Sequence, residues 1–165
     1  MDINLLNKLK KDINIIYRNY NQEYNEIQIK TFYQYCKKQN FKFYLSNNIK
    51  LSMKLGLDGA YIPSFNKSLK HNAFSFNQKF TLIGSAHNLR EIKIKENQNV
   101  KKIFISSLFP KKNKNILGIY KFKNLMKLTK KKIICLGGIN KKNFRKIKFL
   151  NINGIAGINY FQDLK

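Results

Sequence analysis

The sequence predicts an α/β fold in which β-strands and α-helices alternate around a parallel sheet. Seven short apolar segments occur along the chain, and segments with helical spacing of apolar residues separate them. The run Ile133-Ile134-Cys135-Leu136 is apolar without interruption, as is typical of a strand in a parallel sheet covered on both faces. An open doubly wound sheet is the alternative, but no G-x-G-x-x-G motif follows any of the strands, so its dinucleotide-binding form has no support.

The expected elements follow one another in strict alternation. The N-terminal part is expected to form a helix, a strand and a helix over 3–11, 13–17 and 23–38. The segment INIIY is apolar and rich in β-branched residues, whereas Ile27, Phe32 and Tyr35 have helical spacing. The later strands are expected over 41–45, 59–62, 80–83, 102–105, 133–136 and 155–158. Helices fit between them over 49–55, 64–70, 88–96, 118–129 and 140–150.

Seven strands are one fewer than the eight of a closed (β/α)8 barrel, the TIM barrel. The helix over 3–11 is interpreted as the first barrel helix without its strand, and the chain leaves no room for a helix after the seventh strand. We therefore expect one domain over 1–165, a TIM (β/α)8-type barrel that lacks the first strand and the last helix. Either translation starts upstream of Met1, or the barrel is open and a second copy or another partner covers the unpaired edge.

The composition indicates a globular protein, with 43% hydrophobic residues. No apolar run approaches the ~20 residues that a membrane-spanning helix needs, and the N-terminal segment MDINLLNKLKKD mixes charges where a signal peptide would be uniformly apolar. We therefore expect a cytoplasmic protein without membrane contact. Cys36 and Cys135 show no C-x-x-C spacing, so we predict packing roles for them rather than a disulfide or a zinc site.

The formal net charge of +25 raises the question of nucleic-acid binding. The basic residues are nearly all lysines spread along the predicted helices, and the arginines are limited to Arg18, Arg90 and Arg145. Recognition of phosphates and guanine favours arginine. The joint excess of Lys, Asn, Ile, Phe and Tyr indicates residue choice imposed by an AT-rich genome, so we do not favour a nucleic-acid partner.

The chain has only eight carboxylates, and they are spread over the sequence. No pair of them is placed for metal binding or for general acid–base chemistry. Asp58 lies in a G-x-D-G turn before a strand, where we predict that its side chain supports the turn. Of the two histidines, His71 is expected in solvent and His87, at a helix start, is expected to cap or pack.

The turn Gly137-Gly138 follows a buried strand and precedes a helix. Glycines there allow the backbone N–H groups to approach a phosphate, whereas the alternative is an ordinary βαβ unit whose glycines only make turns. Gly154 and Gly157 flank the last strand and suit the close packing of a barrel wall. The segment thus predicts a phosphate site without excluding a structural role.

Four stretches taken in order carry a family resemblance. They are LSNNIKLSMKLGLDGAYIPSFN (45–66), LIGSAHNLREI (82–92), IFISSLFPKKNKNILG (103–118), and IICLGGIN together with NGIAGIN near the C-terminus. In this order they resemble the thiamine phosphate synthase family, including its thiazole tautomerase branch. The resemblance implies a (β/α)8 barrel that joins hydroxymethylpyrimidine pyrophosphate to thiazole phosphate, with Mg²⁺ neutralising the leaving pyrophosphate.

The resemblance assigns the diphosphate and metal side of such a site. Arg18 matches the arginine of a basic cluster that clamps the diphosphate; a salt bridge at the barrel rim is the alternative. Ser46 and Asn47 match an Asn-Asp pair, and Asn66 matches a second metal-binding aspartate. Mg²⁺ would therefore be held weakly, by the amides of Asn47 and Asn66 in place of two carboxylates.

The resemblance also assigns the substrate side. Ser85 matches a serine near the pyrophosphate, and Lys114 matches a lysine that reaches both the pyrophosphate and the pyrimidine. Ser107 stands where the tautomerase branch has a working histidine. The remaining contacts with substrate phosphates are implied for Lys111, Lys112, Asn113, Gly137, Gly138, Ile158 and Asn159.

The function expected from these residues is transfer in thiamine biosynthesis. Arg18, Lys114 and Ser85 would stabilise the leaving pyrophosphate of a dissociative reaction. The alternative is a barrel that binds a phosphorylated ligand without turnover, or an inactive partner of a complete synthase. Because both aspartates of the metal half are replaced, the sequence supports binding more firmly than catalysis.

Overall fold

The computed structural model describes residues 13–20, 23–110, 116–157 and 160. The expected helix over 3–11 lies outside the described residues. So do six of the predicted site residues, Lys111, Lys112, Asn113, Lys114, Ile158 and Asn159.

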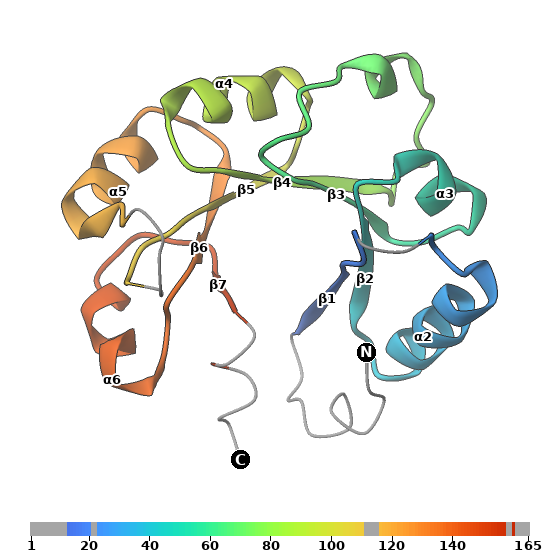
Figure 1. Cartoon of the computed structure of the whole chain (residues 1–165), viewed down its shortest axis with the longest axis horizontal. Coiled ribbons are helices and arrows are strands. Elements are labelled where there is room, and N and C mark those ends of the chain that lie inside the picture. The colour runs from blue at the N-terminus through green and yellow to red at the C-terminus, as the bar shows by residue number, and fades with distance from the viewer. Residues whose placement is uncertain (1–12, 21–22, 111–115, 158–159, 161–165) are drawn as a thin grey trace.

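Seven strands form one parallel sheet whose order follows the sequence from β1 to β7. The strands are β1 (Asn14–Tyr17), β2 (Lys42–Ser46), β3 (Gly59–Ile62), β4 (Thr81–Ala86), β5 (Lys102–Ile105), β6 (Lys132–Leu136) and β7 (Ile155–Ala156). Figure 1 shows that the sheet curls, with the helices on its outer face and with β1 and β7 at its two ends. This is the predicted TIM-type arrangement, in a form that the described strands leave open.

The helices connect successive strands, as right-handed crossovers between parallel strands require. They are α2 (Glu26–Lys38), α3 (Ile49–Lys54), α4 (Leu89–Asn97), α5 (Gly118–Lys127) and α6 (Lys141–Phe144), with 3-10 turns η1 (Lys70–Ala73) and η2 (Arg145–Ile147). Asparagine side chains cap the N-termini of α2, α3, α4 and α6, each accepting a backbone N–H of the first turn. Asparagine, an abundant residue in this chain, therefore provides the N-cap of each of these four helices.

Apolar side chains fill both faces of the sheet. Phe43 and Leu45 of β2 pack on the helix side with Ile29 and Phe32 of α2. The alternate residue of the strand, Tyr44, faces inward, because successive side chains of a strand point to opposite faces. The other buried members of this inner cluster are Tyr61, Ile83, Phe104 and Ile134. Large aromatic side chains thus occupy the inside of the curl.

Both cysteines have the predicted packing roles. Cys36 lies in α2 and Cys135 in β6, and both are fully buried as free thiols. Burial raises the pKa of Cys36 to about 11 and that of Cys135 to about 12. Neither thiol is therefore a reactive group near neutral pH.

Two expected helices differ from the structure. Residues 64–69 form a turn and an extended loop, because Asn66 N–H bonds to the Pro63 carbonyl and the Asn66 side chain accepts the Ser68 N–H. Such an asparagine turn competes with a helix, so the expected helix over 64–70 is wrong except for its last residue, where η1 begins. The helix expected over 140–150 is shorter, since α6 ends at Phe144 and continues only as η2.

His71 is the second correction, because the sequence predicts it in solvent. The residue is 4% exposed, and its Nε2 lies 3.0 Å from the backbone oxygen of Gln98. The polar sequence around His71 does not indicate this contact, because Gln98 lies 27 residues further along the chain. His87, expected to cap or pack, precedes Asn88, the N-cap residue of α4, and its backbone N–H and its Nδ1 both lie within hydrogen-bond distance of the Glu91 carboxylate.

Candidate ligand-binding site

Most of the described candidate residues lie at one edge of the sheet, where the carboxyl ends of the parallel strands meet. Arg18 follows β1, Asn47 follows β2, and Asn66 lies in the loop after β3. Ser85 is the penultimate residue of β4, and Gly137 and Gly138 follow β6. The strand order therefore brings together positions that are up to 120 residues apart in the sequence.

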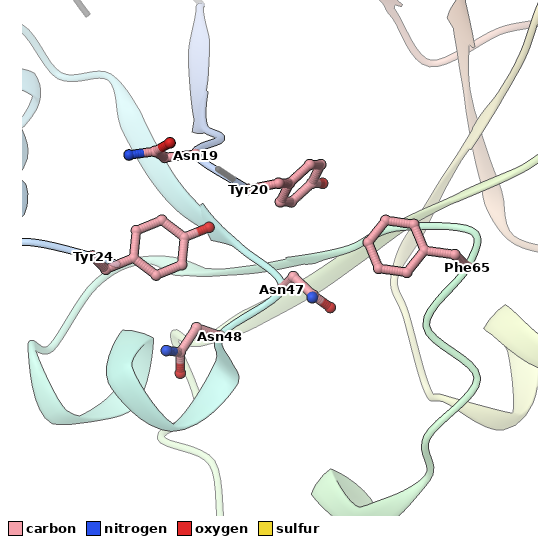
Figure 2. Close-up of a pocket in the computed structure, with 6 residues that line it drawn as sticks. All are labelled: Asn19, Tyr20, Tyr24, Asn47, Asn48 and Phe65. Atoms are coloured by element: carbon pink, nitrogen blue, oxygen red, sulfur yellow. The ribbon is translucent and has the colours of Figure 1, made fainter. Parts of the chain in front are cut away.

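A cavity of about 390 Å³ opens at this edge beside β1, β2 and β3. Its lining is formed by Asn19, Tyr20, Tyr24, Asn47, Asn48 and Phe65. Figure 2 shows the rings of Tyr20, Tyr24 and Phe65 grouped around Asn47. The rings of Tyr20 and Phe65 meet edge to face, with 5.7 Å between their centroids. The cavity lining is thus aromatic and amide-rich and carries no charged side chain.

Ser46 lies beneath the cavity and is fully buried. Its Oγ is 2.7 Å from the Tyr20 hydroxyl, and its carbonyl accepts a hydrogen bond of 2.5 Å from the Tyr24 hydroxyl. Burial raises the pKa of Tyr24, so this hydroxyl keeps its proton and remains a donor. The two tyrosine hydroxyls therefore bond to both oxygen atoms of Ser46, and a substrate contact of Ser46, implied by the family resemblance, stays a prediction.

Arg18 provides a positive charge next to the cavity. Its guanidinium carbon lies 5.1 Å from the centroid of the Tyr20 ring, a cation–π contact with a residue that lines the cavity. Arg18 is exposed and forms no ion pair with any other described residue. The alternative of a salt bridge at the rim therefore has no partner in the described part of the chain, and the diphosphate contact stays a prediction.

The structure brings Asn47 and Asn66 together, the two positions predicted to hold Mg²⁺. Asn66 Nδ2 donates to Asn47 Oδ1 at 2.8 Å, and Asn66 Oδ1 accepts the N–H of Ser68 at 2.9 Å. Both amide oxygens therefore already accept a hydrogen bond, and the positive end of an amide N–H dipole lies against Asn47 Oδ1. No cluster of three His, Cys, Asp or Glu residues occurs among the described residues. As they stand, these side chains do not fit a magnesium ion held by the protein.

Ser85 faces the inner side of the sheet and is 4% exposed. It forms a hydrogen bond with the hydroxyl of Tyr61, whose pKa is raised by burial and partly lowered again by this bond. Tyr61 in turn meets Phe104 edge to face at 5.7 Å. Ser85 thus lies beside the inner aromatic cluster, and its contact with a ligand stays a prediction.

The Gly137-Gly138 turn packs against the segment after β5. Both glycines have positive φ, +100° and +68°, a region that favours glycine. A Cβ on Gly137 would lie 2.6 Å from Ser107 Oγ, and a Cβ on Gly138 would lie 2.8 Å from Phe109 Cβ. Close packing alone therefore requires both glycines. The phosphate role of Gly137 and Gly138 stays a prediction beside this structural one.

Several residues of the site were not predicted from the sequence. Asn19, Tyr20, Tyr24, Asn48 and Phe65 line the cavity. Their signal is positional, since each lies shortly after the carboxyl end of β1, β2 or β3. Sequence motifs for metal and phosphate sites do not include aromatic and amide residues of this kind, because the same residues are common in surface loops.

Comparisons with known proteins agree with the fold and the resemblance. A family model described as thiamine monophosphate synthase matches residues 8–161. The thiamine-phosphate synthase of Prochlorococcus marinus is 28% identical over 127 residues, a match that covers 75% of this chain and 37% of that protein. The thiamine-phosphate synthase of Methanococcus vannielii is 21% identical over 117 residues, covering 69% of this chain and 56% of that protein.

A solved structure is similar over most of the chain. The thiamine phosphate pyrophosphorylase from Pyrococcus furiosus superposes with a TM-score of 0.69 at 18% identity, covering 92% of this chain and 77% of that one. At this identity the likeness shows the fold. The chain spans less than two thirds of the length of the two curated relatives that it matches. Because the family model matches residues 8–161, almost the whole chain, the chain belongs to the thiamine monophosphate synthase family.

Proposed function

We propose that this chain is a thiamine phosphate synthase-like transferase that joins hydroxymethylpyrimidine pyrophosphate to thiazole phosphate. The observation that carries the proposal is that Arg18, Ser85 and the Gly137-Gly138 turn lie toward the carboxyl ends of the parallel strands, the edge of the sheet that also carries the cavity beside β1, β2 and β3. Family membership supports the same reaction class. The cytoplasmic location expected from the sequence belongs to this proposal.

The reaction requires stabilisation of a leaving group more than proton transfer. The bond between the pyrimidine methylene carbon and the diphosphate oxygen breaks, and the diphosphate leaves with the electron pair. The thiazole nitrogen then donates its lone pair to the resulting carbocation and forms the new C–N bond. Arg18 would stabilise the diphosphate charge from the rim of the cavity, and the predicted roles of Ser85 and Lys114 complete this set.

Magnesium enters the proposal only with the substrate. Because the amides of Asn47 and Asn66 bond to each other, the diphosphate itself would supply the ligands and the charge for any ion. Calorimetric titration of the protein with MgCl₂ alone is expected to show no binding. Heat of binding at millimolar affinity in the absence of diphosphate would contradict this expectation.

A second candidate function is ligand binding without turnover. The specific observation in its favour is the amide pair at the two metal positions, with no acidic cluster near it in the described residues. Such a protein would bind thiazole phosphate alone or act beside a complete synthase. It would retain the Gly137-Gly138 turn and lose the diphosphate chemistry.

Steady-state coupling of the two substrates tests the proposal. We expect thiamine phosphate to form in the presence of Mg²⁺, and we expect Arg18→Gln to lower kcat/KM by about tenfold to a hundredfold. Arg145→Gln is the matched control, since Arg145 is equally exposed and lies in η2. Absence of product from the wild-type chain, with thiazole phosphate still bound in calorimetry, would decide for the second function. Absence of both would refute the two together.

A further inference from the structure

Lys95 of α4 is fully buried, although it carries an ammonium group. Its Nζ donates to three oxygen atoms: the carbonyl of Pro63 at 2.9 Å, the carbonyl of Asn66 at 2.8 Å and the side-chain oxygen of Gln98 at 2.7 Å. Its stem packs so tightly on β4 that a Cβ on Gly84 would lie 2.8 Å from Lys95 Cδ. All three protons of the ammonium are used, as a buried charge requires.

Gln98, the C-cap residue of α4, binds the same segment as Lys95. It is fully buried, and its Nε2 donates to the carbonyls of Asn66 and Ser68 at 3.0 and 2.8 Å. Lys95 and Gln98 together bind three carbonyls of the loop 63–68, which joins β3 to η1. The loop has neither strand nor helix bonds of its own over these residues, so its position depends on α4.

The same loop carries two groups of the candidate site. Phe65 lines the cavity and meets the Tyr20 ring, and Asn66 donates to Asn47. The backbone carbonyl of Asn66 is bound by Lys95 from behind, while its side chain points to Asn47 at the cavity. A continuous chain of hydrogen bonds therefore runs from Lys95 through one residue, Asn66, to the cavity wall.

We propose that Lys95 is a positioning residue of the site, which holds the loop 63–68 so that Phe65 and Asn66 close the cavity wall. The proposal rests on the proposed function only in taking this cavity as the ligand site. Lys95 touches no ligand itself and acts through the loop. A purely structural role, in which the lysine fills space under β4, would leave the loop and the cavity unchanged when an apolar chain of equal length replaces it.

Hydrogen exchange of the loop amides in Lys95→Met is the direct test. Met has a similar length and no charge, and replacing a buried charge by an apolar chain often leaves global stability unchanged. We expect the amides of Asn66 and Ser68 to exchange about tenfold faster or more, while the Thr81 amide, bonded to Asp58 at the other edge of the sheet, keeps its rate. Unchanged exchange at Asn66 and Ser68 in a folded variant would overturn the proposal.

Gln98→Leu is a second variant, which removes the loop contacts that come from the Gln98 amide. It is expected to loosen the same loop. Unchanged exchange at Asn66 and Ser68 in a folded Gln98→Leu protein would contradict the dependence of the loop on α4.

Ligand binding provides the functional readout. Calorimetry with hydroxymethylpyrimidine pyrophosphate is expected to show about tenfold weaker binding to Lys95→Met than to wild type, and unchanged binding to Lys93→Met, whose lysine lies exposed on the same helix. Loosened exchange together with unaltered affinity would refute the link from loop to site. If the wild-type chain binds no such ligand, the proposed function fails, while the exchange data still test the position of the loop.

Discussion

Asn47 and Asn66 lie side by side because one amide can donate to another, whereas two carboxylates at the same distance would repel each other. The bond from Asn66 Nδ2 to Asn47 Oδ1 is 2.8 Å long, and the Ser68 N–H satisfies the remaining oxygen. A metal ion would have to break this pair before it could bind. The same geometry would suit an ion if both side chains were carboxylates, since the loop already holds them in contact.

We therefore expect the double substitution Asn47→Asp and Asn66→Asp to create Mg²⁺ binding. Without the ion the variant should lose about 1–2 kcal/mol of unfolding free energy, because an amide bond is replaced by like-charge repulsion. Mg²⁺ at about ten times its Kd should then restore about 1.4 kcal/mol. Thermal unfolding with and without MgCl₂ measures both effects.

Asn99→Asp is the control for this prediction, because Asn99 is an exposed asparagine that also has a positive φ and faces another asparagine, Asn72. It should show no response to MgCl₂. An equal stabilisation of the wild-type chain by Mg²⁺ would contradict the view that the amide pair excludes the ion.

At the scale of elements, the β6–α6 turn and the segment after β5 are packed as one unit. The Phe109 N–H donates to the Gly137 carbonyl, and Asn143 of α6 donates to the Gly138 carbonyl at 2.7 Å. The turn therefore has two independent reasons for glycine, the positive φ and the lack of space beside Phe109. The two reasons can be separated by comparison with a glycine that has a positive φ but has free space where a Cβ would lie.

Gly138→Ala and Gly56→Ala form such a pair. Gly56 has nearly the same φ, +63° against +68°, but a Cβ on it would meet no heavy atom within 4 Å. Urea unfolding should show a loss of about 1–2 kcal/mol for Gly56→Ala from backbone strain alone. Gly138→Ala should lose about 1–3 kcal/mol more, because the new methyl group displaces Phe109. Equal losses of unfolding free energy for the two variants would mean that the segment after β5 moves away from the new methyl group without loss of stability.

At the scale of the whole molecule, the net charge of +25 opposes the compact state. The three ion pairs seen among the described residues are Lys54–Glu26, His87–Glu91 and Lys93–Glu96, all with exposed or half-buried side chains. Pairs of this kind contribute little to stability. Self-repulsion among the lysines is therefore only weakly compensated within the described part of the chain.

Salt should consequently stabilise the protein. We expect the Tm to rise by about 4–8 °C as NaCl increases from about 0.05 M to about 0.5 M, a range over which the Debye length falls by about threefold. Differential scanning calorimetry measures the change, with sucrose at matched osmolality as the uncharged control. A constant or falling Tm would show that self-repulsion is not a significant part of the folding free energy.

No helix of the described residues is long and apolar enough to span a membrane. The strands β1 and β7 end the sheet and do not pair with each other in the described part of the chain. The expectation that a second copy or another partner covers this edge therefore stays a prediction. Light scattering at several protein concentrations would test it.

Much of the fold follows from local patterns. The strands β3 and β5 occupy the predicted residues, and the other strands begin within one residue of the expected positions. Apolar runs of four to six residues between polar turns determine such strands locally. The loop after β3 was predicted as a helix. Its asparagine turn is local, within residues 63–68, but its bonds to α4 come from residues about 30 positions away and leave no local signal.

The sequence by itself determined the seven strands and their order along the chain, most of the helices, and the family resemblance. It also showed that both metal positions carry amides. Only the tertiary structure decided that these amides bond to each other, that Tyr20 and Tyr24 bond to Ser46, and that a buried Lys95 holds the loop beside them. The physical reason is that apolar periodicity is encoded over a few residues, whereas burial and hydrogen bonding of a polar side chain depend on which distant segments pack against it.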